Sequence, residues 1–227
     1  SNTDVDDAIY VWNADLNGGS GAFATCVGGV STPAVGAGGI GNTIPSGQGF
    51  FVHATAATTL SATESIKVNS NPTFLKTGQA EPVVGSVFRL FLDGTNGVHD
   101  ETVLHFNVDA SSGFDSQFDA YKLLAMDQSS PYIACEMNNS MYSINGLPAL
   151  TGNVHIPIKV ITSVSGIFSI SPFEINNLPS SACVYLQDLL TGTTHDLRTG
   201  SYNCYLYDTT STSRFVLNIS YSGSLDA

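Results

Sequence analysis

Apolar and polar residues alternate one by one in short runs along the second half of this chain. In residues 154–161, "VHIPIKVI", every second residue is apolar, and the same period of two recurs in residues 101–108 and 213–220. This period places the apolar side chains on one face of a β-strand. Roughly eight or nine such runs, bounded by Gly, Asn, Asp or Pro, follow one another between residues 87 and 220, a pattern typical of a β-sandwich.

The first eighty residues carry fewer strand signals. The strand candidates are residues 8–14, 22–28, 49–55 and 65–70, and Gly-rich irregular sequence joins them. Because four strands make a poor free-standing domain, we interpret this part as the trailing end of a first sandwich module.

The predicted fold class is therefore all-β, with two tandem antiparallel β-sandwich modules of jelly-roll or immunoglobulin-like type. The first module occupies residues 1–80 and is incomplete in this chain, and the second occupies residues 81–227. A linker at residues 75–86, which contains Gly and Pro, joins the two. An incomplete sandwich leaves a sheet edge or a core face open, and we expect an upstream segment or a neighbouring copy of the chain, as in a filament, to cover it.

The charge balance excludes several classes of partner. The chain has 7 Lys and Arg against 19 Asp and Glu, a formal net charge of −12. Nucleic acid binding needs basic residues to neutralise phosphates, and an acidic membrane surface would repel this chain. No run approaches the roughly 20 apolar residues of a membrane-spanning helix, so we expect no membrane insertion. Charged residues are only 11% of the chain, which favours an extracellular location.

The motif "GAGGIG" at residues 36–41 matches the dinucleotide-binding pattern G-x-G-x-x-G. That pattern works only where a helix follows, because the helix N-terminus holds the pyrophosphate. Pro45 and Gly47 lie where this helix would run. We therefore interpret the motif as a turning loop. The best helix candidate in the chain is residues 112–126, "SGFDSQFDAYKLLAM".

Seven segments together carry a family resemblance. They are "AIYVWNADLNGG" (8–19), "IPSGQGFFVHA" (44–54), "FRLFLDGTNGVHDETVLHF" (88–106), "GFDSQFDAYKLL" (113–124), "YSINGLPAL" (142–150), "VYLQDLLTGTTHDL" (184–197) and "RFVLNIS" (214–220). In this order they resemble the C-terminal tandem β-sandwich region of surface proteins that Bacteroidota export by the type IX secretion system, upstream of the sorting domain. The resemblance implies an extracellular or cell-surface location, but enzymes and adhesins alike carry such modules.

The sequence contains none of the common catalytic motifs: no H-E-x-x-H, no G-x-S-x-G and no phosphate-binding loop. The five histidines are scattered, and His105 and His155 fall on the polar faces of alternating strands, where we expect them to be exposed. A triad assembled only in space stays open as an alternative. We therefore predict that the protein is not an enzyme.

A group of carboxylates is a candidate calcium site, because Ca²⁺ takes six to eight oxygen ligands. Its members are Asp93, Asp100, Glu101, Asp115 and Asp119, in two Gly-containing segments. The alternative is that Asp115 and Asp119 cap a helical turn and pair with Lys122, while Asp93 starts a turn. Calcium is the one cofactor that the sequence suggests.

Cys183 and Cys204 each lie in a strand-like run, with a turn-rich segment between them. If the two strands pair, the cysteines can form a disulfide, and the alternative is two independent buried thiols. Cys26 and Cys135 lie in different halves of the chain and are expected to be free.

Two further features concern ligands and modification. Tyr10 and Trp12 share one face of a strand and are candidates for stacking on a sugar ring, although cross-strand packing of aromatic residues is commoner. Thr209, in Asp-Thr-Thr, resembles the acceptor that Bacteroidota use for O-glycosylation of exported proteins.

These observations predict a non-catalytic extracellular module with a structural or adhesive role in a secreted cell-surface protein, and a filament subunit is one form of it. Its partners would be other copies of the chain or other surface proteins. The alternative is an accessory carbohydrate-binding module of a secreted hydrolase, with a polysaccharide as partner.

Overall fold

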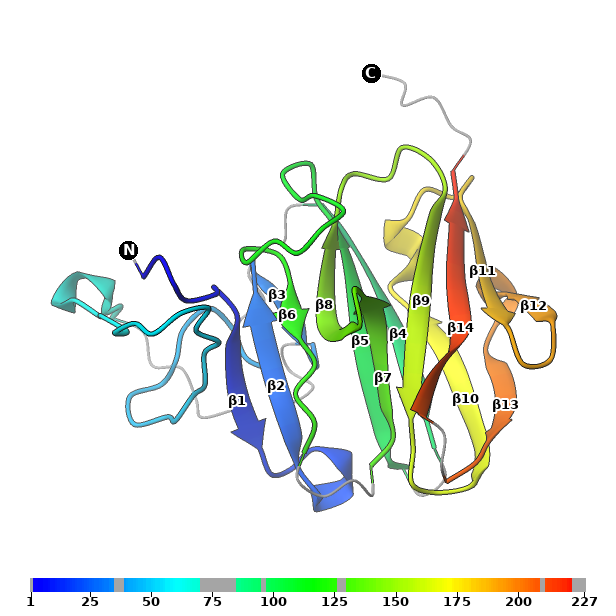
Figure 1. Cartoon of the computed structure of the whole chain (residues 1–227), viewed down its shortest axis with the longest axis horizontal. Coiled ribbons are helices and arrows are strands. Elements are labelled where there is room, and N and C mark those ends of the chain that lie inside the picture. The colour runs from blue at the N-terminus through cyan, green and yellow to red at the C-terminus, as the bar shows by residue number, and fades with distance from the viewer. Residues whose placement is uncertain are drawn as a thin grey trace.

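The protein is all-β in the computed structural model (Figure 1), as the alternating sequence predicts. The structure describes residues 2–34, 39–69, 85–94, 97–125, 130–208 and 211–221. The strands are β1 (Ile9–Asn13), β2 (Ala22–Val27), β3 (Val30–Thr32), β4 (Ser86–Asp93), β5 (His99–Phe106), β6 (Ala120–Tyr121), β7 (Tyr132–Met137), β8 (Ser140–Leu147), β9 (Val154–Ile161), β10 (Gly166–Phe173), β11 (Cys183–Asp188), β12 (Thr193–Asp196), β13 (Tyr202–Leu206) and β14 (Ser211–Ser220). The short 3₁₀ turns are η1 (Asn17–Gly19), η2 (Glu64–Ile66), η4 (Ile175–Asn177) and η5 (Leu197–Thr199). None of the helical segments in the described part is long and apolar enough to cross a membrane.

One large sheet forms most of the molecule. It has eleven strands in the order β12-β11-β14-β9-β7-β8-β5-β4-β10-β13, with β6 paired to β8. The sheet folds over so that its two halves enclose one apolar core, to which β4, β5, β9, β10, β11 and β14 all contribute buried residues. Where the two ends of the sheet come together, Arg214 in β14, the third strand from one end, donates a hydrogen bond of 2.7 Å to the carbonyl oxygen of Tyr205 in β13, the strand at the other end. The result is a flattened, nearly closed β-sandwich.

A second, smaller sheet, in the order β1-β2-β3, packs against the outside of the large one (Figure 1). Its inner face and the outer face of β4, β5, β6 and β8 share a second apolar cluster, made of Ala8, Tyr10, Val27, Val30, Val87, Val103, Ala120 and Ile144. The irregular segment that begins at residue 39 covers the other face of the small sheet. There the backbone N–H of Ile40 donates to the hydroxyl of Ser31, and Cys26 donates to the side-chain oxygen of Asn42.

The prediction of an all-β fold is confirmed, but the described residues show no open face on the small sheet. The small sheet is too short to stand alone, and its two faces are covered by the large sheet and by residues of this same chain. One open edge is covered too, because β1 forms bridges from Tyr10 to Phe51 and, just before it, from Val5 to Ala54. The boundary proposed near residue 80 lies outside the described residues, so the division into two modules stays a prediction, as does filament assembly.

Several local expectations need correction. Residues 49–55 form only isolated bridges and residues 65–69 contain the end of a 3₁₀ turn, so neither is a strand. The helix expected at 112–126 is absent from its described part, where a turn leads into β6. His105 is buried rather than exposed, because the ring of Phe118 and the segment that carries it lie over that face of β5. Strands β5 and β8 run parallel, whereas the other pairs are antiparallel.

Gly146 in β8 lies in close contact with the segment before β6. A β-carbon added there would lie 2.5 Å from Cβ of Phe118 and 3.2 Å from its backbone. We expect Gly146→Ala to lower the free energy of unfolding by about 1–3 kcal/mol, since overpacking forces the backbone to move. Urea unfolding measures the change. Gly152→Ala is the control, because its added methyl group meets no atom within 4 Å. Equal stability of the two variants would contradict the packing described here.

Candidate functional site at the interface of the two sheets

Charged side chains lie buried between the small and the large sheet. Arg89 in β4 and Glu101 in β5 project from the outer face of the large sheet, and both side chains are only 6% exposed. The guanidinium of Arg89 donates to the Glu101 carboxylate at 2.8 Å and to the carbonyl oxygen of Ser31 in β3 at 2.7 Å. It also donates to Glu174 at 2.9 Å. One arginine therefore joins the small sheet to two strands and a turn of the large one.

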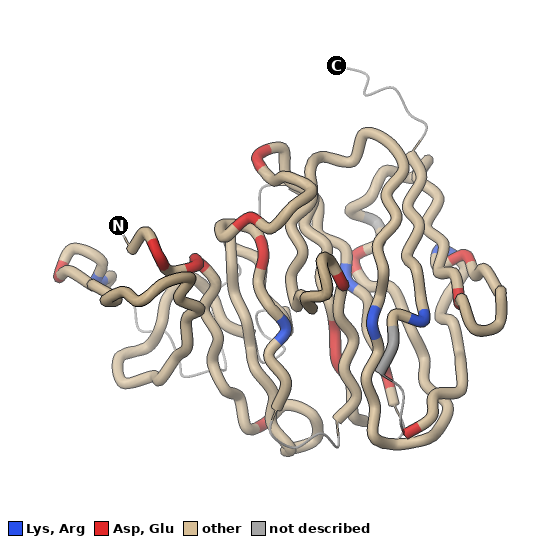
Figure 2. The backbone as a smooth tube through the Cα atoms, viewed as in Figure 1, with Lys and Arg blue, Asp and Glu red and all other residues tan. Residues whose placement is uncertain are grey.

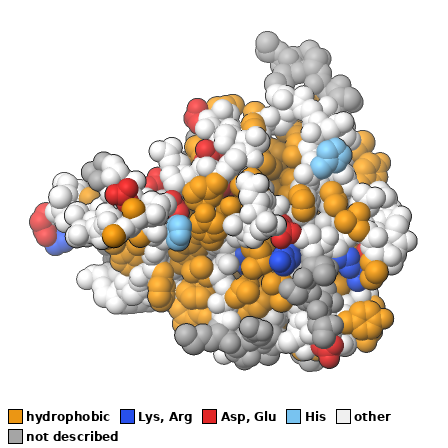
Figure 3. Space-filling model, in the orientation of Figure 1, with side chains coloured by type: hydrophobic (Ala, Val, Ile, Leu, Met, Phe, Trp, Pro, Cys, Tyr) orange, Lys and Arg blue, Asp and Glu red, His pale blue; other side chains and the backbone are white. Residues whose placement is uncertain are grey.

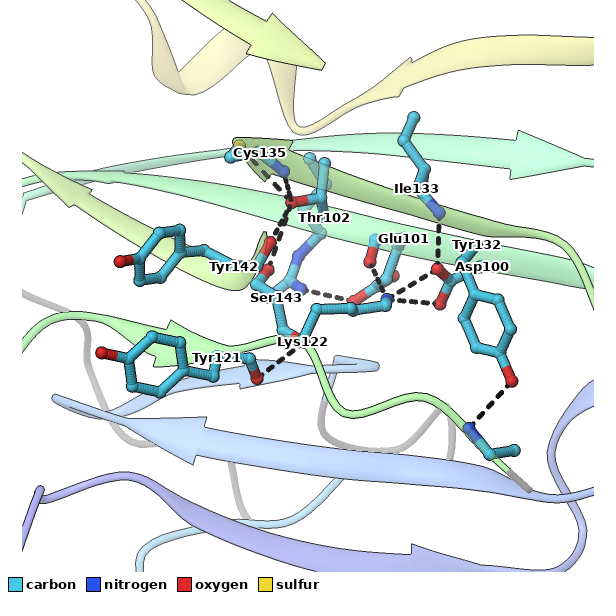
Figure 4. Close-up of polar contacts among 12 residues, drawn as sticks. Asp100, Glu101, Thr102, Tyr121, Lys122, Tyr132, Ile133, Cys135, Tyr142 and Ser143 are labelled. Atoms are coloured by element: carbon cyan, nitrogen blue, oxygen red, sulfur yellow. Dashed lines mark hydrogen bonds and ion pairs between the residues drawn. The ribbon is translucent and has the colours of Figure 1, made fainter. Parts of the chain in front are cut away.

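Lys122 and Asp100 form a second ion pair, next to Glu101 (Figure 4). The ammonium of Lys122 lies 2.6 Å from the Asp100 carboxylate and donates to the backbone oxygen of Glu101 at 2.9 Å. Asp100 also accepts a hydrogen bond of 2.8 Å from the backbone N–H of Ile133 in β7. Lys122 therefore does not pair with Asp115 or Asp119, as the sequence suggested. It follows β6 directly, and the antiparallel pairing of β6 with β8 directs its side chain to β5.

On the acidic groups of this interface, burial raises the pKa, whereas hydrogen bonds and a neighbouring positive charge lower it. Burial raises the pKa of Glu101, and the positive charge of Arg89 opposes that rise. Burial likewise raises the pKa of Asp119 to about 6, although its carboxylate accepts hydrogen bonds from the backbone N–H groups of Asp115 and Gly146. These carboxylates bind groups of the protein itself.

The five carboxylates proposed for calcium do not converge. Asp100 and Glu101 each have a basic partner, and Asp93 accepts from the hydroxyl of Ser171 at the other side of β4. Asp115 and Asp119 bind backbone N–H groups within their own turn or in β8. In the described part of the chain, no three His, Cys, Asp or Glu residues are grouped as a metal site would require.

Calcium binding stays a prediction, and thermal melting with calcium or with EDTA tests it. A calcium site that includes these carboxylates would raise the melting temperature in saturating calcium, because a ligand of the folded state stabilises that state. An unchanged melting temperature would leave only the structural roles described above.

The predicted disulfide between Cys183 and Cys204 is not formed, and all four cysteines are free thiols. The strands that carry the two residues are not paired: β11 lies between β12 and β14, whereas β13 pairs with β10. Cys183 is exposed and Cys204 is buried. Burial raises the pKa of Cys26, Cys135 and Cys204 to about 11, which keeps these three thiols protonated at neutral pH.

Only one of the two candidate sugar-stacking residues is exposed. Tyr10 and Trp12 share one face of β1, as predicted, but Tyr10 is buried under the large sheet, where its hydroxyl accepts a hydrogen bond from the N–H of Tyr121. Trp12 is 38% exposed and meets Phe23 edge to face, with 5.2 Å between ring centroids. Phe23 in turn meets Phe51, which is 56% exposed.

A second aromatic group lies along the same interface. Tyr121 stacks on Phe114 and on Tyr142, and the ring centroid of His53 lies 5.0 Å from that of Tyr121. Figure 3 shows hydrophobic side chains gathered on this face over β6 and the nearby end of β1. His53 also lies 2.6 Å from the Asp6 carboxylate. The sequence gives no signal for this pair, because 47 positions separate the two residues.

Two further candidates complete the comparison with the sequence. His155 is exposed, as expected, and forms a hydrogen bond with Asn218 in the neighbouring strand. Thr209, the candidate glycosylation site, lies outside the described residues, so its modification stays a prediction. Among the described residues, the backbone positions of Lys and Arg are spread over several segments (Figure 2).

Comparison with known proteins gives one family. No curated protein and no solved structure shows significant similarity to the chain. The profile of a family described as a domain of unknown function (DUF8693) matches residues 2–219, which includes both sheets and the charged interface between them. The chain therefore belongs to the DUF8693 family.

Proposed function

We propose that the chain is a non-catalytic extracellular module with a structural or adhesive role in a cell-surface protein. The observation that supports the proposal is that basic residues, which are few in this chain, are buried in ion pairs between strands. The side chains of Arg89, Lys122 and Arg214 are 6–8% exposed, and each is ion-paired to a carboxylate on another strand. Such pairs position whole strands relative to one another and leave these charges unavailable to a substrate. The sequence resemblance to exported surface proteins supports the location.

The same feature predicts resistance to trypsin, which cleaves after Lys and Arg. Among the described residues we expect early cleavage only after Lys67, whose side chain is 71% exposed in a segment outside the strands. Mass spectrometry of a timed digest identifies the cut, and Lys67→Gln is the control that removes it. Because the two sheets share a core, the nicked fragments should elute together in size-exclusion chromatography. Early cuts after Arg89, Lys122 or Arg214 would contradict the proposal.

The proposed absence of catalysis can be tested at a pair of described residues that resembles part of a catalytic triad. His53 and Asp6 form a His–carboxylate contact beside an aromatic surface. We expect no turnover of ester, glycoside or peptide substrates by the purified protein. Turnover that His53→Gln abolishes, in a variant with unchanged melting temperature, would show an enzyme.

Antibody labelling of intact producing cells tests the proposed extracellular location, and a protein detected only after lysis would contradict it.

A second candidate function is binding of carbohydrate, because the exposed rings of Trp12 and Phe51 lie on either side of Phe23. Exposed aromatic rings offer flat apolar surfaces to the C–H face of a sugar. Sedimentation with insoluble polysaccharides tests this function. Trp12→Ala should abolish co-sedimentation, and Tyr205→Ala, which removes an exposed ring on β13, should leave it intact.

A further inference from the structure

Lys122 and Asp100 form an ion pair that is both short and shielded from water. Their side chains are 7% and 13% exposed, and Nζ of the lysine lies 2.6 Å from the carboxylate. By comparison, the ion pair of Lys67 is exposed, and Nζ of Lys159 lies 3.7 Å from its carboxylate partner. The amine and the carboxyl group of this pair are therefore held together with little access for solvent.

The lysine nitrogen lies close to both oxygens of the carboxyl group (Figure 4). The distance from Nζ of Lys122 is 2.6 Å to Oδ1 of Asp100 and 2.6 Å to Oδ2. An atom at that distance from both oxygens lies within about 3 Å of the carbon that joins them, a spacing from which two atoms can react. Nζ and Cγ are therefore placed as a nucleophile and an acyl carbon.

Hydrogen bonds to neighbouring strands hold both groups in position. Oδ2 of Asp100 accepts a bond of 2.8 Å from the backbone N–H of Ile133 in β7. Nζ of Lys122 donates to the backbone oxygen of Glu101 at 2.9 Å, and the backbone N–H of Lys122 donates to the carbonyl oxygen of Met141 in β8 at 2.8 Å. Fixed groups react as if at concentrations of about 10⁵–10⁸ M, which favours a condensation that would not proceed between separate molecules.

The surroundings of the pair also accommodate the water molecule that a condensation releases. Asp100 and Lys122 line a hollow of about 20 Å³ between the two sheets, which has room for about one water molecule. The other titratable residues that line it are His99 and Glu101. The Glu101 carboxylate is paired with Arg89 at 2.8 Å, so Lys122 has Asp100 as its carboxylate partner.

We propose that Lys122 and Asp100 become joined by an amide bond between Nζ and Cγ. A proton first passes from the ammonium to the carboxylate, and burial favours the resulting neutral amine and neutral carboxyl group, because buried charges lose their hydration. Nζ then attacks Cγ, the C–N bond forms, and the hydroxyl group leaves as water with a second proton from the nitrogen. The bond ties β5 to the residue directly after β6, 22 positions along the chain. This inference goes beyond the structural role proposed above, which does not depend on it.

Mass spectrometry of the intact, denatured protein tests the bond, because denaturation disrupts an ion pair but not an amide. We expect the main species to be lighter than its sequence by the mass of one water molecule. Lys122→Arg keeps the positive charge but removes the amine, so this variant should have the full mass of its sequence. Lys159→Arg is the matched control, in a looser ion pair with Glu136, and should still lack one water molecule.

Fragmentation of a protease digest should then identify one branched peptide that is joined through the side chains of Lys122 and Asp100. If the unaltered protein has the full mass of its sequence, the two residues form an ion pair only and the inference is overturned. It is also overturned if Lys122→Arg still lacks a water molecule, since the dehydration then lies elsewhere, as in a cyclised aspartate. The first measurement needs no variant, so the test remains decisive even if Lys122→Arg does not fold.

Discussion

Arg89→Met is expected to lower the free energy of unfolding by about 3–5 kcal/mol, the cost of leaving a buried charge without its partner. The variant keeps the Glu101 carboxylate buried and removes the guanidinium that lies 2.8 Å from it. It also removes the hydrogen bond to Ser31, which links the small sheet to the large one. Urea unfolding followed by circular dichroism measures the loss.

Two controls separate the ion pair from other effects of the substitution. Lys67→Met removes an exposed basic residue, from an ion pair with Glu64, and should cost less than about 1 kcal/mol. The double variant Arg89→Met/Glu101→Gln should recover much of the loss, since no buried carboxylate then lacks a partner. An Arg89→Met variant as stable as Lys67→Met would refute the structural role given to the charged interface.

The loss in Arg89→Met should also depend on pH. Burial raises the pKa of Glu101, and Arg89 opposes that rise, so the pKa rises further without Arg89. A carboxyl group with a raised pKa in the folded state favours folding while it is protonated, and this contribution is lost as the pH increases. The difference in stability between the unaltered protein and the variant should therefore shrink as the pH is lowered from 7 to 5.

Asp188→Asn is expected to have an effect of similar size, about 3–5 kcal/mol, at the seam that closes the large sheet. Asp188 is fully buried at the end of β11 and accepts hydrogen bonds from the guanidinium of Arg214 and the hydroxyl of Tyr202. The substitution leaves Arg214, whose side chain is 8% exposed, without a counter-charge. Strands β11, β13 and β14 then lose the group that joins them.

The acid dependence of stability provides an independent check on Asp188. Burial alone would raise its pKa, but hydrogen bonds from Arg214, Tyr202 and the N–H of Leu190 outweigh burial and lower the pKa to about 2. A carboxyl group with a lowered pKa stabilises the fold above its unfolded pKa of 3.8, and this contribution is lost as the pH falls towards 2. The stabilities of the unaltered protein and Asp188→Asn should converge over that range.

Asp196→Ala is the matched control, because the Asp196 side chain caps the turn η5 by accepting from the N–H of Arg198. It should cost about 1 kcal/mol, the usual value of a capping residue. If Asp188→Asn and Asp196→Ala were equally destabilised at pH 7, the seam would not depend on Asp188.

The sequence predicts those strands best that have one buried and one exposed face. Residues 154–161 and 183–188 coincide with β9 and β11, since apolar and polar side chains alternate there. The alternating pattern does not predict β7. Its first four residues, Tyr132, Ile133, Ala134 and Cys135, are all buried, so neither face of the strand is polar there.

The candidate site was harder to predict, because its residues meet only through the packing of the two sheets. Arg89 bonds to Ser31 and to Glu174, which are far from it in sequence and on different elements. The sequence marks Asp100 and Glu101 as part of a candidate metal site. In a sequence, however, carboxylates that bind a metal cannot be told from carboxylates that pair with a basic residue. The sequence identifies Trp12, whereas its contact with Phe23 depends on the pairing of β1 with β2.

The shared core of the two sheets fixes an order of folding. The inner face of the small sheet packs on Val87, Val103 and Ile144, so its docking surface is complete only when β8 has been synthesised. A sheet of three short strands is at best marginally stable alone, and pairing strands that are distant in sequence is slow, in milliseconds to seconds. Strands β1, β2 and β3 therefore become ordered only after residues more than a hundred positions further along the chain have joined the large sheet.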